Sequence, residues 1–128
     1  LGDIVRQYGM MSRKTAIAKQ RESHLLLHLS WEGCEQAGYS YKLFEYLAAR
    51  RPIISIGLGN DMTEELLNET KAGVHFSTLD DIKCELTKLY QEYSLSGEIS
   101  YGGNESIICR YDHRVTAMKF VETLNRVA

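Results

Sequence analysis

The residues best suited to chemistry gather between Gly38 and Glu45, in the stretch GYSYKLFE. A short loop of small and polar residues runs here into a helix that is expected to begin near Tyr41. The first turn of a helix leaves backbone N–H groups unpaired and carries the positive end of the helix dipole. The loop from Gly38 to Tyr41 therefore indicates a site for an anion.

Histidine and cysteine positions bear on metal binding. His24 and His28 have the spacing of a metal pair on a helix, but they flank the leucine run of HLLLHLS, which predicts a strand. In a strand the two residues would be about 13 Å apart, so they could not share an ion. The cysteines are odd in number and far apart, at Cys34, Cys84 and Cys109. This pattern favours packing residues in a reducing compartment, and we predict no metal site and no disulfide.

Two other patterns carry only a weak indication of phosphate binding. The sequence Gly57-Leu58-Gly59 resembles a phosphate loop but lacks the third glycine and the Lys-Ser or Lys-Thr pair of a Walker motif. The first predicted helix has four basic residues, for which a solvated helix face is favoured over a phosphate clamp. These residues are Arg13, Lys14, Lys19 and Arg21.

Glu45 lies on a predicted amphipathic helix that leads directly into a buried strand. One side of this helix is expected to pack on a layer, because its apolar residues fall in a helical period. They are Leu43, Phe44, Leu47 and Ala48. Pro52 ends the helix, since proline lacks the N–H of the next turn. The β-branched run from Ile53 to Ile56 then predicts a parallel strand buried on both faces.

The rest of the chain alternates strands and helices in the same way. Strands are predicted at Asp3 to Tyr8, at His24 to Ser30 in a central position, and at Val74 to Ser77. Helices are predicted from Ser12 to about Arg21, from Asp61 or Thr63 to Gly73, from Asp80 to Tyr93 and from about His113 to Val127, with a loop at 94–106. This order predicts an α/β fold, with a parallel sheet and helices on both of its faces.

Composition limits the class of partner. The chain has 128 residues, 44% of them hydrophobic, which is enough for one domain over residues 1–128. Fifteen Lys and Arg against 17 Asp and Glu give a net charge of -2, so we expect no nucleic-acid partner. No apolar run is long enough for a membrane span and no signal peptide leads the chain, so a cytoplasmic location is expected. The chain starts at Leu1, which suggests a fragment of a longer protein.

The stretch KLFEYLAARRPIIS, from Lys42 to Ser55, resembles the core motif of nucleotide-sugar-dependent glycosyltransferases with the GT-B fold, in the large retaining group called family four. The resemblance implies a Rossmann-like domain that forms one half of the GT-B fold. It implies the C-terminal, donor-binding domain of a two-domain enzyme, without the N-terminal domain that binds the acceptor.

The resemblance also implies roles for single residues. Glu45 is expected to accept hydrogen bonds from the ribose hydroxyls of the donor. Gly38, Ser40, Tyr41 and Lys42 are expected to complete the nucleotide-sugar site, with loop N–H groups directed at the diphosphate. No catalytic residue is assigned. An earlier glutamate of the family falls at Ala37 in this chain, so either the donor sugar is held without it, which we favour, or Glu35 takes its place.

The implied function is transfer of a sugar, with retention, from a nucleotide-sugar to a glycan or lipid-linked acceptor, as in polysaccharide biosynthesis. The nucleotide-sugar is a substrate and no cofactor is expected. Membrane contact would come only through the full-length protein, if at all, and this chain alone is expected to be inactive. The alternatives are a nucleotide- or effector-binding module without catalysis, in which Glu45 is an exposed residue paired with Lys42 or Arg51, and a nucleotide-sugar epimerase domain.

Overall fold

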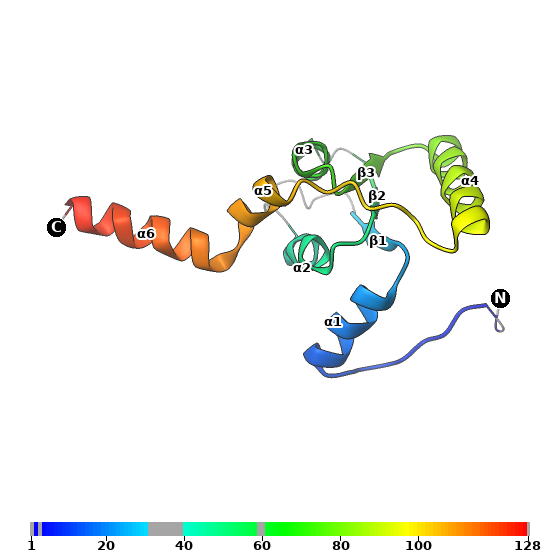
Figure 1. Ribbon diagram of the computed structural model, residues 1–128, viewed down its shortest axis with the longest axis horizontal. Coiled ribbons are helices and arrows are strands. Elements are labelled where there is room, and N and C mark those ends of the chain that lie inside the picture. The colour runs from blue at the N-terminus through cyan, green and yellow to red at the C-terminus, as the bar shows by residue number, and fades with distance from the viewer. Residues whose placement is uncertain (1, 3, 31–39, 59–60, 128) are drawn as a thin grey trace.

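The centre of the protein is a parallel sheet of three short strands in the order β1-β2-β3 (Figure 1). A computed structural model describes residue 2 and residues 4–30, 40–58 and 61–127. The strands are β1 (Leu26–Leu29), β2 (Ile53–Ile56) and β3 (Gly73–Phe76). Leu26 pairs with Ile53, and Ile53 pairs with Gly73, so the three strands run in step. The buried, parallel β2 that the isoleucine run predicts is confirmed.

Helices surround this sheet. They are α1 (Arg13–Glu22), α2 (Tyr41–Ala49), α3 (Asp61–Thr70), α4 (Leu79–Ser96), α5 (Glu105–Ile108) and α6 (His113–Val127), with a 3-10 helix η2 (Cys109–Tyr111) between the last two. Figure 1 shows α2 and α3 on one side of the strands and α4 on the other. The predicted α/β class is confirmed, as a small open parallel sheet with helices.

The core lies between the sheet and the two helices α2 and α3. Leu26 and Ile53 face it from the strands, and it is completed by Leu43, Leu47, Ala49, Leu66, Leu67 and Ala72. Ala49 rather than the predicted Ala48 is buried on α2. Burial of one Leu or Ile side chain contributes about 1.5 to 3 kcal/mol, so these few residues supply most of the hydrophobic stabilisation.

Two strand predictions are wrong. Residues 4–8 form no strand, and Ile4 and Val5 are exposed, so the alternating pattern there lacks a neighbouring strand to pair with. β1 is an edge strand of the described sheet rather than a central one. Burial alternates along β1, because Leu26 and His28 face the core, whereas Leu27 and Leu29 lie on the other face of the sheet and are more than half exposed.

Other boundaries and faces also differ from the prediction. α3 ends at Thr70, before Gly73, because Lys71 adopts a left-handed conformation. Most of the large apolar side chains of α4 are exposed, and Ile82 is its buried residue. Cys84 and Cys109 are exposed rather than packed, and Cys34 lies outside the described residues. No helix in the described part of the chain is long and apolar enough to cross a membrane.

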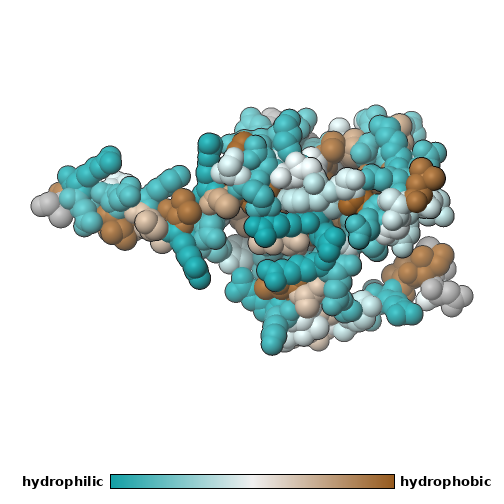
Figure 2. All heavy atoms as spheres, viewed as in Figure 1, coloured by the Kyte–Doolittle hydropathy of each residue, from teal (hydrophilic) through white to brown (hydrophobic). Residues whose placement is uncertain are grey.

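α6 projects from the body of the protein with its apolar side chains uncovered (Figures 1 and 2). Met118, Val121 and Leu124, which fall in the helical register, are each more than half exposed, and so is Phe120. The accessible surface is 9670 Å², whereas a compact monomer of this mass exposes about 6,900 Å². The helical period therefore predicted the secondary structure of this segment correctly, but it did not predict which side chains are buried.

Lys71 carries a backbone strain that a substitution can relieve. Its φ of 55° lies in the left-handed region, where a side chain with a Cβ costs about 1 to 2 kcal/mol. We expect Lys71→Gly to raise the free energy of unfolding by about 0.5 to 1 kcal/mol, the strain relief minus the entropy that glycine loses on folding. Urea denaturation measures this change. Lys71→Ala is the control, because alanine keeps the strain, and an equal gain in that variant would contradict the explanation.

Candidate functional site

The amino end of α2 lies where the sheet presents the carboxyl ends of its strands, the usual place for ligands in open α/β sheets. Ser40 occupies the N-cap position in an extended conformation, and its backbone oxygen accepts from the N–H of Leu43 at 3.0 Å. The Ser40 hydroxyl makes no capping hydrogen bond, in contrast to Ser12 before α1. The first turn of α2 therefore keeps N–H groups that an anion could accept from.

A pocket of about 200 Å³ opens beside this helix. Residues from three parts of the chain line it: the exposed side of α1, one side of α2 and the turn before α6. The lining includes Arg13, Tyr41, Phe44, Glu45, Tyr111 and His113. Complete small-molecule sites usually measure at least about 300 Å³, so this pocket could hold one part of a nucleotide but not all of it.

Glu45 is the carboxylate of the pocket. One of its oxygens, Oε1, lies 3.5 Å from Nε of Arg13, and its side chain is only 19% exposed, against 70% for Arg13. The ion pair is therefore formed between a sheltered carboxylate and a largely hydrated guanidinium. Such a pair contributes little to stability, but it holds the carboxylate toward the pocket.

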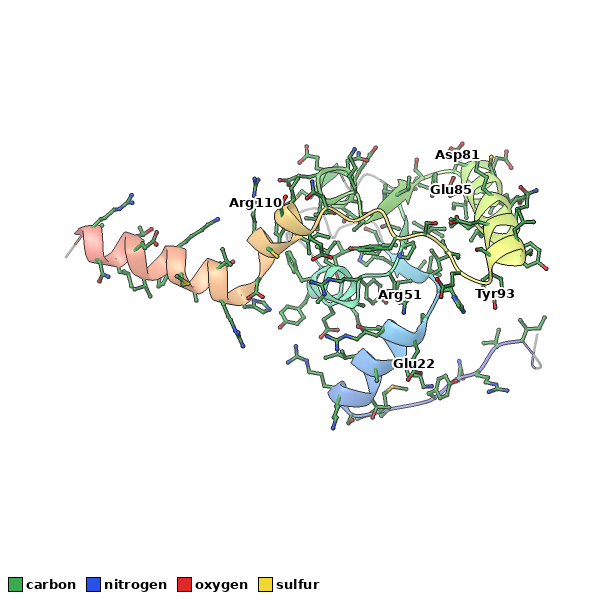
Figure 3. The ribbon with its side chains drawn as sticks, viewed as in Figure 1. Glu22, Arg51, Asp81, Glu85, Tyr93 and Arg110 are labelled. Atoms are coloured by element: carbon green, nitrogen blue, oxygen red, sulfur yellow. The ribbon has the colours of Figure 1, made fainter. Side chains whose placement is uncertain are left out.

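This ion pair differs from the one that the non-catalytic alternative predicts. Glu45 is neither fully exposed nor paired with Lys42 or Arg51, and Nε of Arg51 instead donates to the backbone oxygen of Arg21 at 2.8 Å (Figure 3). The four basic residues of α1 are exposed, as a solvated helix face predicts, and Arg13 and Arg21 also line the pocket. Lys19 does remain on the surface, where it pairs with Glu22 at 3.1 Å.

Aromatic side chains form the wall of the pocket next to α6. The rings of Tyr41 and His113 stack with centroids 5.9 Å apart and planes at 20°, and Tyr41 Oη lies 3.4 Å from His113 Nε2. Phe44 packs against Tyr111 at 5.9 Å. Tyr111 in turn donates a hydrogen bond of 2.6 Å to Glu69 of α3. The wall thus joins α2, α3 and the turn before α6.

The structure brings together only part of the predicted site. Tyr41 and Glu45 line the pocket and Ser40 precedes it, whereas Lys42 is exposed and is not among the lining residues. Gly38, Ala37 and Glu35 lie outside the described residues. Arg13, Tyr111 and His113 were missed, because each lies far from Glu45 in the sequence.

The structure also tests part of the phosphate-loop pattern, at Gly57. The N–H of Gly57 donates to the backbone oxygen of Phe76 at 3.1 Å, so the sheet uses it and it is not available to a phosphate. Within residues 2, 4–30, 40–58 and 61–127, no three His, Cys, Asp or Glu side chains are grouped so that they could hold a metal ion.

Comparison with models of protein families, with curated proteins and with solved structures finds no significant match. The pocket, and the motif that supplies its carboxylate, are therefore the features that point to a function.

Proposed function

We propose that this chain binds the nucleotide part of a nucleotide-sugar, as the Rossmann-like, donor-binding domain of a glycosyltransferase with the GT-B fold. The observation that carries the proposal is the position of Glu45. Its carboxylate is sheltered in a pocket that runs along α2, and it belongs to the motif from Lys42 to Ser55 that resembles this family. A sheltered carboxylate favours ligands that carry hydroxyl donors, because a hydrogen bond to a charged acceptor contributes about 1.5 to 3 kcal/mol.

Groups in and around the pocket suit different parts of a nucleoside diphosphate. Oε1 of Glu45 contacts Arg13, which leaves Oε2 to accept from ribose hydroxyls. The first-turn N–H groups of α2 are suited to a phosphate, and the exposed guanidinium of Arg13 can donate to an anion from its two Nη atoms. The exposed ring of Tyr41 provides a flat apolar surface for a base.

In the proposed enzyme, a second domain of the same protein would hold the glycan or lipid-linked acceptor. Sugar transfer with retention would then depend chiefly on electrostatic stabilisation of the departing diphosphate. The resemblance assigns no catalytic residue to this chain, and the acceptor would be held by the second domain. We therefore expect this chain alone to bind a nucleotide without turning it over, and sugar transfer by the isolated chain would contradict this division of roles.

A nucleotide panel tests the proposal. UDP, GDP and their sugar conjugates are titrated into the chain and followed by ligand-observed NMR. We expect one of the two bases to bind with a Kd on the order of 1 mM, which corresponds to about 4 kcal/mol, because a pocket of this size contacts only part of the ligand. Inorganic pyrophosphate is the control for simple anion binding. If no nucleotide binds more tightly than pyrophosphate, the proposed function is wrong.

A further inference from the structure

Two histidines share one serine hydroxyl inside the sheet. His28 of β1, Ser55 of β2 and His75 of β3 are direct neighbours in the strand register, one residue before each strand ends. Nδ1 of His28 and Nδ1 of His75 each lie 3.0 Å from Oγ of Ser55. Ser55 is fully buried, His28 is 6% exposed and His75 is half-buried. We call these three residues the histidine layer.

Proton counting fixes how the layer can be arranged. A hydroxyl donates one hydrogen bond and accepts up to two, and a neutral imidazole carries its proton on only one nitrogen. In the described part of the chain, Oγ of Ser55 has no acceptor other than the two rings. When both rings are neutral, one Nδ1 must therefore donate to Oγ while the other accepts from it. The two histidines are obliged to be opposite tautomers.

A first proton fits this arrangement and a second does not. If His75 becomes an imidazolium, its Nδ1–H donates to Oγ, and the Ser55 hydroxyl still donates to Nδ1 of His28. If both rings are charged, both Nδ1–H groups must donate to Oγ, and the proton of the Ser55 hydroxyl is left without an acceptor among the described residues. A buried donor without an acceptor is costly, and two neighbouring cations add to that cost.

The surroundings of the layer make His28 the ring that stays neutral. The helices on its face present uncharged buried side chains, which are Leu43 and Leu47 from α2 and Thr63, Leu66 and Leu67 from α3. Glu45 is the half-buried acid of α2 and it pairs with Arg13, while Glu64, Glu65 and Glu69 of α3 are exposed. Burial lowers the pKa of His28, and the nearby His75 lowers it further.

We propose that the histidine layer is a pH-sensitive device. His75 takes up the first proton, and the Ser55 hydroxyl then accepts from His75 and donates to His28. The layer opens when a second proton reaches His28. Opening would separate the carboxyl ends of the three strands, which border the amino ends of α2 and α3. The proposal does not depend on the nucleotide function.

The effect on stability has a definite sign. A histidine whose pKa is lower in the folded than in the unfolded protein stabilises the fold fully above its unfolded value of about 6.5. That contribution is lost as the pH falls toward the lower, folded pKa, since the unfolded chain then binds the proton more strongly. The histidine layer should thus make the protein less stable in mild acid.

Long-range 1H–15N spectra of the imidazoles test the device in the unmodified chain, because they separate the two neutral tautomers from the imidazolium. As the pH falls from 8 to 5, His75 is expected to become charged while His28 stays neutral with its proton on Nε2. Loss of the native spectrum should accompany protonation of His28. The proposal is overturned if His28 charges first, if both rings charge together in a native spectrum, or if His28 keeps its proton on Nδ1 while His75 is charged.

A Ser55→Ala variant tests the role of the hydroxyl. Without Oγ, His28 is expected to lose the Nε2–H tautomer that it adopts when His75 is charged, and its ring signals should shift toward an average of both neutral forms. His24 and His113 lie outside the layer and serve as internal references whose signals stay unchanged. An unchanged His28 tautomer in a folded variant contradicts the proposed role of Ser55. If the variant does not fold, the titration of the unmodified chain tests the proposal.

Discussion

A Gly73→Ala substitution is expected to lower the free energy of unfolding by about 3 kcal/mol or more. Gly73 opens β3 and pairs with Ile53 of the central strand. A Cβ atom at Gly73 would overlap the backbone oxygen of Ile53 and lie 2.7 Å from its carbonyl carbon. This oxygen belongs to the backbone, so no rotamer change can relieve the clash, and β3 must move away from β2. Folded domains of this size are stable by only about 5 to 15 kcal/mol, so the loss should be evident in urea denaturation.

Gly102→Ala is the matched control for this prediction. A Cβ at Gly102 would meet its nearest atom, the backbone oxygen of Lys71, at 3.8 Å, which is an ordinary contact. The control should leave the urea midpoint nearly unchanged. Equal stability of the two alanine variants would show that β2 and β3 do not approach each other as closely as described.

A Glu45→Gln substitution is expected to weaken nucleotide binding at least tenfold. Glutamine has nearly the same shape, but it replaces a charged acceptor by a neutral one, and a bond to a charged group exceeds a neutral one by roughly 1 kcal/mol. Two ribose hydroxyls on one carboxylate would double that difference, and every 1.4 kcal/mol is about tenfold in Kd. The fold should remain intact, because the ion pair that the substitution removes involves an Arg13 guanidinium that is 70% exposed. Ligand-observed NMR titrations of both proteins measure the ratio.

Glu64→Gln provides the control, since it makes the same change of charge on an exposed position of α3, outside the pocket. It should bind nucleotide like the unmodified chain. If the two variants bind equally well, Glu45 is a structural residue, and a binding module that recognises its ligand elsewhere would explain the protein better.

The parts of the fold that the sequence predicted well are those that local chemistry decides. The isoleucine run after Pro52 forms β2, and Ser12 caps α1 as expected, whereas α2 ends at Ala49 because Arg50 adopts a left-handed conformation before Pro52 is reached. Burial of whole faces was not predictable in this way. The segment from Ile4 to Tyr8 alternates like a strand, but a strand needs a neighbour for its backbone hydrogen bonds, and none is formed there.

The candidate site was predictable only from its central helix. Glu45 and Tyr41 came from the motif, whereas Arg13 reaches the carboxylate from a helix that is distant in the sequence. The histidine layer shows the same limit. His28 was compared with His24 along the chain, but its partners are Ser55 and His75 across the sheet, and only the strand register brings them together.

The most direct measurement of the central claim compares the preferred nucleoside diphosphate with its 2′-deoxy form in titrations of this chain. If Glu45 accepts hydrogen bonds from the ribose hydroxyls, the deoxy ligand should bind several-fold more weakly to the unmodified protein, and this difference should vanish in Glu45→Gln. Equal affinities of the two ligands for the unmodified protein would show that Glu45 does not read the ribose, and would contradict the account.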